Sequence, residues 1–247
     1  MRAFHRTHSS LIFVFMIQAI FFDFNGVIID DEPLQMEAYR AALAAHDIPL
    51  TEEDYYSLLG ADDVRFIRAV FERAGRELPD ETLRAVLERK SELHRGMLEG
   101  ELPLFPGVVT FIKAVARSYA VGLVSMARRE EIDYALKRAG LERHLSVVVS
   151  AEDDRPCKPD PYCYRHALEL LNARRQDAHI IPLRADECLV VEDSPPGVES
   201  ARAAGMRTLG VTNTVPERAL RAAGADVVTH SLADWTVDAV HHVFDER

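Results

Sequence analysis

Six short apolar runs, separated by stretches with helical periodicity, restrict the folds that are open to this chain of 247 residues. The runs cover Ile17–Phe22, Tyr119–Val124, Leu145–Val149, Glu187–Val191, Met206–Val211 and Asp226–Thr229. Short apolar runs are typical of buried strands, and strands that alternate with helices are joined by right-handed crossovers. We therefore predict an α/β fold built on a doubly wound, Rossmann-like parallel sheet with helices on both faces.

One long interval, residues 33–103, has helical periodicity and no convincing strand. Thr51 followed by Asp54 resembles a capping box, which marks the start of a helix. Two apolar faces follow at helical spacing, formed by Val64, Ile67, Val70, Phe71 and Ala74 and by Leu83, Val86, Leu87, Leu93 and Met97. We predict an all-helical cap at residues 33–103, inserted into a core made of residues 16–32 and 104–247.

The residues before Met16 imitate a signal peptide, because Arg2 and Arg6 precede an apolar stretch. That stretch is too short to span a bilayer, no small-residue cleavage site follows it, and it runs directly into Asp23. We therefore expect residues 1–15 to be a loose leader in front of the folded part.

Acidic residues outnumber basic ones by 40 to 29, which gives a net charge of −11 at pH 7. This balance repels nucleic-acid phosphates and anionic lipid, and the sequence contains no local basic patch that would override it. The three cysteines form no C-x-x-C pair, which fits a reducing compartment better than a disulfide framework. We expect a cytoplasmic protein, monomeric or weakly dimeric, with no nucleic-acid or membrane partner.

Reactive side chains stand where the predicted strands end. They are Asp23 after the first run, Ser125 after the second, Lys158 in the loop after the third, and Glu192 and Asp193 after the fourth. Chemistry in open α/β sheets occurs beyond the carboxyl ends of the strands, so we expect these groups on one rim. Clustered carboxylates repel one another, and Mg²⁺ with oxygen ligands is their natural partner. Each residue alone is more often a helix cap or a solvated side chain, and only their joint order indicates a site.

Four motifs carry a family resemblance: Asp23-Phe24-Asn25-Gly26-Val27, Val124-Ser125-Met126, Lys158-Pro159, and Val191-Glu192-Asp193-Ser194 followed by Gly197. In their order and spacing the chain, over residues 17–240, resembles hydrolases of the haloacid dehalogenase superfamily. The resemblance is to the phosphoglycolate phosphatase and β-phosphoglucomutase-like branch, whose members carry a helical cap. It implies Mg²⁺-dependent phosphoryl transfer through an aspartyl-phosphate.

The same resemblance implies roles for individual residues. Asp23 would be the nucleophile and a metal ligand, and Asp193 a second ligand. The backbone carbonyl of Asn25 would complete the metal site, with Glu192 either a ligand or a support for the ligands. Ser125 would hold the phosphoryl oxygens, and Lys158 would balance the negative charge of the transition state.

Asn25 departs from the family pattern, in which a second aspartate two residues after the nucleophile acts as general acid and base. An amide cannot transfer a proton, although it keeps the backbone ligand. Proton transfer by a positioned group is worth roughly 10²- to 10⁴-fold, so we expect slow turnover that least affects good leaving groups. Two alternatives stay open: Asp30, Asp31 or a cap residue transfers the proton after closure, or a fraction of the chains carries a deamidated residue 25.

The cap is expected to close over the site and to select the substrate. Arg65 follows Gly60-Ala61-Asp62-Asp63-Val64, near the place where related enzymes carry a specificity loop, and is the candidate contact for a distal group of the substrate. The histidines have no zinc-like spacing, and the sequence contains no glycine-rich nucleotide-binding motif.

These observations predict a Mg²⁺-dependent phosphatase that hydrolyses a small phosphorylated metabolite such as a sugar phosphate. A mutase similar to β-phosphoglucomutase is the enzymatic alternative, although it would need proton delivery in both half-reactions. A catalytically silent protein that binds a phosphorylated ligand is the alternative from another class. Phosphate release from a panel of esters separates the three.

Overall fold

The computed structural model describes residues 16–100, 102–153 and 156–245. In this part of the chain, six parallel strands form one sheet, and each corresponds to a predicted apolar run. The strands are β1 (Ala19–Phe22), β2 (Ala120–Val124), β3 (Val147–Val149), β4 (Cys188–Glu192), β5 (Arg207–Val211) and β6 (Val227–Thr229). The predicted parallel sheet is therefore confirmed, with small differences at the strand ends.

Helices separate the strands, as the sequence predicts. The α-helices are α1 (Glu32–Ala44), α2 (Glu52–Tyr56), α3 (Asp63–Arg73), α4 (Asp80–Leu98), α5 (Val108–Val115), α6 (Arg129–Ala139), α7 (Tyr162–Asp177), α8 (Pro195–Ala203), α9 (Glu217–Ala223) and α10 (Val237–Phe244). Short 3₁₀ turns occur at η1 (Glu142–His144), η2 (Ala185–Glu187) and η3 (Leu232–Asp234). The chain alternates between strand and helix except in the interval from α1 to α5, where only helices occur among the described residues.

Strand β1 lies inside the sheet, whose order is β3-β2-β1-β4-β5-β6. Its last residue, Phe22, is in register with Leu123 of β2 on one side and with Val191 of β4 on the other. The chain extends the sheet from β1 toward β3 first and then toward β6, so β1 borders the topological switch point. Ligands of such sheets bind beyond the carboxyl ends of the strands at this point. The register thus brings the residues after β1, β2 and β4 to one place.

Alternate side chains of β1 contact opposite helical layers. Ile20 and Phe22 pack with residues of α5, α6 and α10, whereas Ala19 and Phe21 pack with residues of α7 and α8. All four side chains are fully buried. A strand that is covered on both faces is apolar at every position, which explains why this run is continuous rather than alternating.

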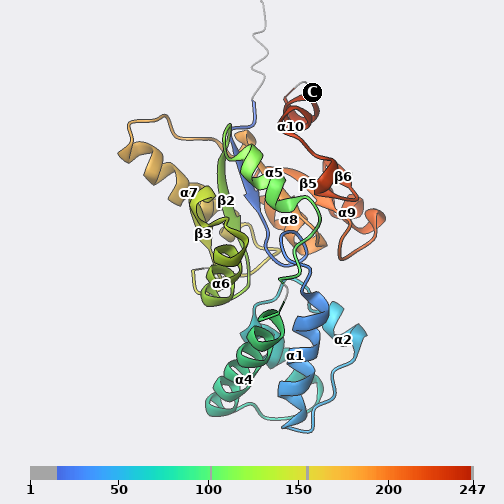
Figure 1. Ribbon diagram of the computed structural model, residues 1–247. Helices are drawn as coiled ribbons and strands as arrows, with labels where there is room; N and C mark the ends of the chain where they lie inside the picture. Colours follow the sequence, from blue (N-terminus) through green and yellow to red (C-terminus); the bar gives the residue numbers. More distant parts are fainter. Residues whose placement is uncertain (1–15, 101, 154–155, 246–247) are drawn as a thin grey trace, which may run out of the picture.

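Helices α1 to α4 form a separate layer beyond the carboxyl ends of the strands, at the bottom of Figure 1. This layer has its own apolar cluster, to which Leu43, Ile67 and Val86 contribute from α1, α3 and α4. Thr51 caps α2 as predicted, because its hydroxyl accepts a hydrogen bond from the backbone N–H of Asp54 at 3.1 Å. An inserted helical cap on an α/β core is therefore confirmed. The exact division at residues 33 and 103 stays a prediction.

One predicted face of the cap is only partly right. Helix α4 buries Leu83 and Val86 as expected, but Leu93 and Met97 are partly exposed. The side chains that its second half buries are Lys90, Ser91, His94 and Leu98. Three of these are polar, because this half of α4 faces carboxylates of the core rather than another apolar helix. Apolar periodicity cannot reveal a buried face whose residues are stabilised by pairing.

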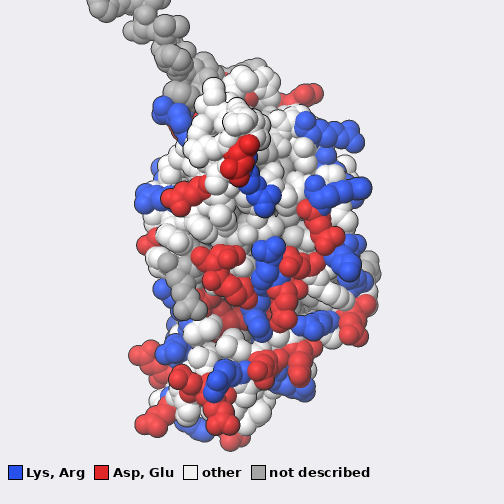
Figure 2. Space-filling view, turned by 90° about the vertical axis from the view of Figure 1, so that its left-hand side faces the viewer, with Lys and Arg blue, Asp and Glu red and all other residues white. Residues whose placement is uncertain are grey.

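Several expectations concern the surface and the ends of the chain. The expected leader, residues 1–15, lies outside the described residues. No helix in the described ranges combines the length and the apolarity that a bilayer crossing requires. Figure 2 shows a face on which basic and acidic side chains are mixed rather than separated into fields of one sign. The cysteines, Cys157, Cys163 and Cys188, are all buried.

Candidate active site

Asp23 directly follows β1, and the chain then turns at Gly26. The backbone N–H of Asp23 donates to the carbonyl of Val191 at 3.0 Å, which fixes Asp23 at the end of the sheet. Gly26 has a φ of 74°, and a Cβ at this position would lie 1.9 Å from Oδ2 of Asp193. Only glycine tolerates this conformation and this approach. The turn therefore brings the backbone after Asp23 against the carboxylate that follows β4.

Lys158 lies between two carboxylates. Its Nζ is 2.7 Å from Oδ1 of Asp23 and 2.6 Å from Oε1 of Glu192, and all three side chains are buried. Burial lowers the pKa of Lys158, but the two carboxylates outweigh burial and raise this pKa well above its ordinary value. Lys158 is therefore an ammonium ion that is held beside Asp23. The structure thus brings together the residue after β1, a residue from the loop after β3 and the last residue of β4.

Glu192 uses both of its carboxylate oxygens within the protein. Oε1 accepts from the Tyr164 hydroxyl at 2.9 Å in addition to Lys158, and Oε2 accepts from the backbone N–H groups of Asp193 and Ser194 at 3.1 and 3.2 Å. A Cβ on Gly197 would lie 1.8 Å from Oε1, so the backbone of α8 also closes around this group. Glu192 was expected either to bind the metal or to support the metal ligands. Because both of its oxygens already accept hydrogen bonds within the protein, these bonds favour the supporting role.

The carboxylates of Asp23, Glu192 and Asp193 each place an oxygen within 4.8 Å of the others. Burial raises the pKa of Asp23 to about 7 in spite of the neighbouring lysine. Burial and the carboxylates of Glu192 and Asp23 raise the pKa of Asp193 well above its ordinary value. A divalent cation would remove this repulsion, and hard oxygen donors are the ligands that Mg²⁺ prefers. The donor set therefore fits a magnesium ion.

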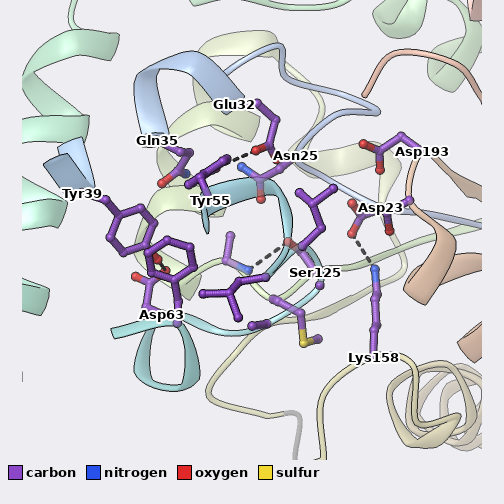
Figure 3. A pocket seen from close by; sticks show the side chains of 18 of the residues that line it. Asp23, Asn25, Glu32, Gln35, Tyr39, Tyr55, Asp63, Ser125, Lys158 and Asp193 are labelled. Carbon is purple, nitrogen blue, oxygen red and sulfur yellow. Dashed lines mark hydrogen bonds and ion pairs between the residues drawn. The ribbon is translucent and has the colours of Figure 1, made fainter. Parts of the chain in front are cut away.

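Ser125 follows β2 and faces the same space. Its Oγ accepts the backbone N–H of Ala127 at 3.0 Å, which leaves the hydroxyl proton to donate to a ligand. Ser125 lines one cavity together with Asp23, Asn25, Lys158 and Asp193 (Figure 3). The individual roles of these residues stay predictions, but their expected convergence at one rim is what the structure shows.

The side chain of Asn25 is turned toward Asp31. Its Nδ2 donates to both carboxylate oxygens of Asp31, at 2.9 and 3.0 Å. Gln35 donates to Oδ2 of Asp31 at 3.1 Å, and Nε2 of His94 lies 2.9 Å from the same oxygen. Burial lowers the pKa of His94, but the carboxylates of Asp31 and Glu131 outweigh burial and raise this pKa to about 9. Asp31 is therefore enclosed by donors and has no exposed surface.

Helices α1 to α3 contribute polar side chains to the cavity that were not predicted as site residues from the sequence. They are Glu32, Gln35, Tyr39, Tyr55 and Asp63 (Figure 3). The Tyr55 hydroxyl donates to Oε2 of Glu32 at 2.6 Å, and the Tyr39 hydroxyl donates to Oδ1 of Asp63 at 2.5 Å. Residues 32, 35 and 39 are separated by three and four positions, which places them on one face of α1. That spacing, directly after the Asp23 motif, was the available signal.

Two basic residues of the cap, Arg65 and Lys90, have different surroundings. Arg65 is exposed on α3 and is not among the residues that line the cavity, so the structure does not bring it to the predicted site. Lys90 lines the cavity, but its Nζ is paired with Asp63 at 3.2 Å and with Glu131 at 3.3 Å. These carboxylates neutralise Lys90, so it is not an unpaired cation that awaits a second phosphate.

Contacts between the cap and the core close the cavity. Glu131 belongs to α6 of the core, and its pairing with Lys90 joins α6 to α4 of the cap. The thiol of Cys157 donates to Oδ2 of Asp62 at 2.8 Å, between the third-strand loop and the cap. A Cβ on Gly60 would lie 3.0 Å from Pro196, so the cap loop touches the start of α8. The cap therefore lies directly over the ends of the strands.

Comparisons with known proteins agree with this arrangement. Residues 17–205 match the model of the haloacid dehalogenase-like hydrolase family. A phosphorylated carbohydrates phosphatase of Thermotoga maritima is 31% identical over 214 residues, which cover 85% of this chain and 92% of the relative. The fructose-1-phosphate phosphatase YqaB of Escherichia coli is 29% identical over 78% of this chain and 95% of its own. The crystal structure of β-phosphoglucomutase from Clostridium difficile shares the fold, with a TM-score of 0.80 at 20% identity over 94% of this chain and 98% of that one.

Proposed function

The chain belongs to the haloacid dehalogenase-like hydrolases and is a phosphoric monoester hydrolase, and we propose that it is a Mg²⁺-dependent phosphatase of small phosphorylated carbohydrates. The observation that carries this proposal is the position of Asp23. Its carboxylate projects from the end of β1 into the cavity between the core and the cap, 2.7 Å from the Lys158 ammonium. A nucleophile next to a fixed cation is the arrangement that attack on an anionic phosphorus requires.

The reaction that we propose has two steps on this chain's own residues. An Asp23 oxygen attacks phosphorus, the ester P–O bond breaks, and an aspartyl-phosphate forms. Water then attacks the same phosphorus and releases phosphate and the free carboxylate. Lys158 stays beside the phosphoryl group and balances its charge in both steps, while the Ser125 hydroxyl donates to a phosphoryl oxygen.

Asp23, Asp193 and the backbone carbonyl of Asn25 would hold the magnesium ion in this proposal. When bound, the ion supplies positive charge that offsets the repulsion between the phosphoryl group and the carboxylates. Glu192 would orient Lys158 rather than bind the metal, because its oxygens already accept bonds from the lysine, Tyr164 and the start of α8. Thr214 donates to Oδ2 of Asp193 and fixes the second ligand.

The charge of the cap wall supports a substrate with one phosphate and a neutral, hydroxylated remainder. This wall is lined by Glu32 and Asp63 of the cap helices and by Glu131, which reaches it from α6 of the core. The only cation among the described residues of this wall, Lys90, is already paired with Asp63 and Glu131. A second phosphate would meet carboxylates, and like charges brought together cost several kcal/mol. Hydroxyl groups, in contrast, would find the phenols and amides of the wall. The relatives named for phosphorylated carbohydrates and fructose 1-phosphate are in keeping with this substrate class.

Phosphate release tests the proposal. The purified protein is incubated with Mg²⁺ and a panel of esters that contains p-nitrophenyl phosphate, glycerol phosphates and hexose phosphates. We expect release of inorganic phosphate by the parent and none by Asp23→Ala, with Asp177→Ala, an exposed aspartate on α7, as the matched control. Acid-quenched parent should carry a phosphoryl group on the peptide that contains Asp23.

Other outcomes would replace the proposal with one of its alternatives. Binding of a phosphorylated ligand with no release from any ester would identify a silent binding protein. Interconversion of hexose phosphates without net release of phosphate would identify a mutase. Each result is read on the same samples by ³¹P NMR, which resolves free phosphate from the isomeric esters.

A further inference from the structure

Asn25 leaves the proposed reaction without an obvious proton donor. Three carboxylates near it in the sequence could supply the proton, those of Asp30, Asp31 and Glu32, and the structure gives them different surroundings. Asp30 is exposed and does not line the cavity. Asp31 is fully buried behind Asn25, and donors from Asn25, Gln35 and His94 surround its carboxylate. Neither carboxylate faces the space in which a substrate would bind. The position that remains is Glu32, at the start of α1.

Glu32 faces the cavity that contains the nucleophile. It lines this space together with Asp23 and Asn25, and both Glu32 and Asn25 are labelled in Figure 3. The Tyr55 hydroxyl donates to Oε2 of Glu32 at 2.6 Å and thereby fixes the side chain from the cap. This bond occupies one oxygen. The carboxyl group is therefore positioned by the cap and faces the cavity that also contains Asp23 and Asn25.

We propose that Glu32 is the catalytic acid and base of this enzyme, in the role that Asn25 cannot perform. The proposal rests on the proposed phosphatase activity. It assigns the proton transfers to a residue that reaches the site from the first turn of the cap, rather than from the loop that carries the nucleophile.

Each proton transfer is balanced. In the first step an Asp23 oxygen bonds to phosphorus, the ester P–O bond breaks, and the departing alkoxide oxygen takes the proton of the Glu32 carboxylic acid. In the second step the Glu32 carboxylate takes a proton from water, whose oxygen bonds to phosphorus as the P–O bond to Asp23 breaks. The cycle ends with phosphate, a free Asp23 carboxylate and protonated Glu32.

The charged surroundings of Glu32 support this role. Burial raises the pKa of Glu32, the Tyr55 hydrogen bond lowers it, the nearby Asp31 and Asp23 carboxylates raise it, and Lys90 lowers it, with a pKa of about 7 as the result. The carboxylate of Glu32 also interacts electrostatically with two further ionisable groups, Tyr56 of α2 and Asp193 after β4, and raises the pKa of both. A group with a pKa near 7 populates both its acid and its base form at neutral pH, which is what one residue acting twice requires.

The test compares two ester classes in Glu32→Gln. An alkyl ester such as fructose 1-phosphate needs a proton on its leaving oxygen, whereas p-nitrophenolate leaves without one. We expect kcat for the alkyl ester to fall by about 10²- to 10⁴-fold, while the single-turnover release of p-nitrophenolate stays within about threefold of the parent. Phosphate release after that burst should slow, because water attack lacks its base. Glu37→Gln, an exposed change on the same helix, should keep the parent values.

A second variant keeps the proposal testable if Glu32→Gln folds poorly. Tyr55→Phe removes a hydrogen bond that lowers the pKa of Glu32, so the alkaline limb of the kcat profile for the alkyl ester should move to higher pH. An unmoved alkaline limb, an unchanged kcat in Glu32→Gln, or an equal slowing of both ester classes would overturn the role of Glu32. Absence of phosphate release by the parent with every ester would instead refute the phosphatase itself, so the two failures are distinguishable.

Discussion

Asn25 and Asp31 form an amide–carboxylate pair, in which Nδ2 of Asn25 donates to both oxygens of Asp31 at 2.9 and 3.0 Å. The pair explains why an asparagine is compatible with this site. A carboxylate at position 25 would face a second, buried carboxylate at hydrogen-bond distance. The amide of Asn25 therefore cannot transfer a proton, but it donates hydrogen bonds to the buried carboxylate of Asp31.

The first prediction follows from that pair. Asn25→Asp should lower the free energy of unfolding by about 1–3 kcal/mol at pH 8, because it removes a donor to a buried group and adds a like charge. Urea unfolding at pH 8 measures this loss. The exchange variant Asn25→Asp/Asp31→Asn restores one amide and one carboxylate, and should regain part of the lost stability. Equal stability of the single variant and the parent at pH 8 would contradict the pairing.

His94 gives the second prediction, on stability and pH. Its pKa is raised from 6.5 to about 9, so its contribution to stability is fully present below pH 6.5 and is lost as the pH rises through 9. His94→Gln leaves Asp31 and Glu131 without their shared cation and should cost roughly 3 kcal/mol near neutral pH. The difference between the parent and the variant should narrow between pH 7 and pH 9.5. His242→Gln, at an exposed histidine of α10, serves as the control. A difference that is constant over this range would argue against a protonated His94.

Adjacent glutamates on α6 allow a third, matched prediction. Glu131 is buried and pairs with Lys90 of the cap, whereas Glu130 pairs on the surface with Arg95 at 3.2 Å. Burial raises the pKa of Glu131, but Lys90 and His94 outweigh burial and lower it to about 2, so its contribution persists above pH 4.5 and is lost as the pH falls through 2.

Glu131→Gln should therefore destabilise the protein by roughly 3–5 kcal/mol at pH 7, and Glu130→Gln by less than about 1 kcal/mol. Both glutamates join α6 of the core to α4 of the cap, but only the Glu131 pair is buried. Loss of Glu131 should therefore also speed proteolysis in the two segments that connect the cap to the core, around residues 30 and 103. Thermal unfolding and limited proteolysis of the two variants measure this. Equal effects of the two substitutions would show that the buried pair does not hold the cap.

The sequence predicted the sheet because its signal is local: a strand that is covered on both faces, such as Ala19–Phe22, is apolar at each position. The rim residues were predicted because each lies at the end of a strand or, for Lys158, in the loop after one. Glu32, His94 and Glu131 were not, since their function depends on partners from other elements. The sequence alone does not distinguish a buried, paired lysine such as Lys90 from a solvated one. Only the packing of α4 against α6 shows that Lys90 is paired. Arg65 is exposed and does not line the cavity, because proximity along the chain does not reveal which side of a helix faces the site; its contact with substrate stays a prediction.

Magnesium binding gives the fourth prediction. A ligand that binds only the folded state stabilises it by about 2.7 kcal/mol at a concentration of 100 times its Kd, so Mg²⁺ should raise the melting temperature of the parent. Asp193→Asn should remove most of this rise. Without the metal the variant should be at least as stable as the parent, because it removes a carboxylate that its neighbours repel. Asp177→Asn on the surface of α7 should respond to Mg²⁺ as the parent does. An undiminished Mg²⁺ response in Asp193→Asn would exclude this residue as a ligand.

The charge of the cap wall makes the fifth prediction, on substrate choice. Fructose 1-phosphate and fructose 1,6-bisphosphate differ by one phosphate, and the second phosphate would meet Glu32, Asp63 and Glu131. We expect kcat/KM to favour the monophosphate by at least about tenfold, since like charges brought together at a binding site cost several kcal/mol. Asp63→Asn removes one carboxylate and leaves Lys90 with a single partner, so it should narrow the preference through a lower KM for the bisphosphate. Asp133→Asn, on the exposed side of α6, should leave the preference unchanged. A parent that prefers the bisphosphate would show that Lys90 is released from its carboxylates when substrate binds, and that the charge balance of this wall does not select the substrate.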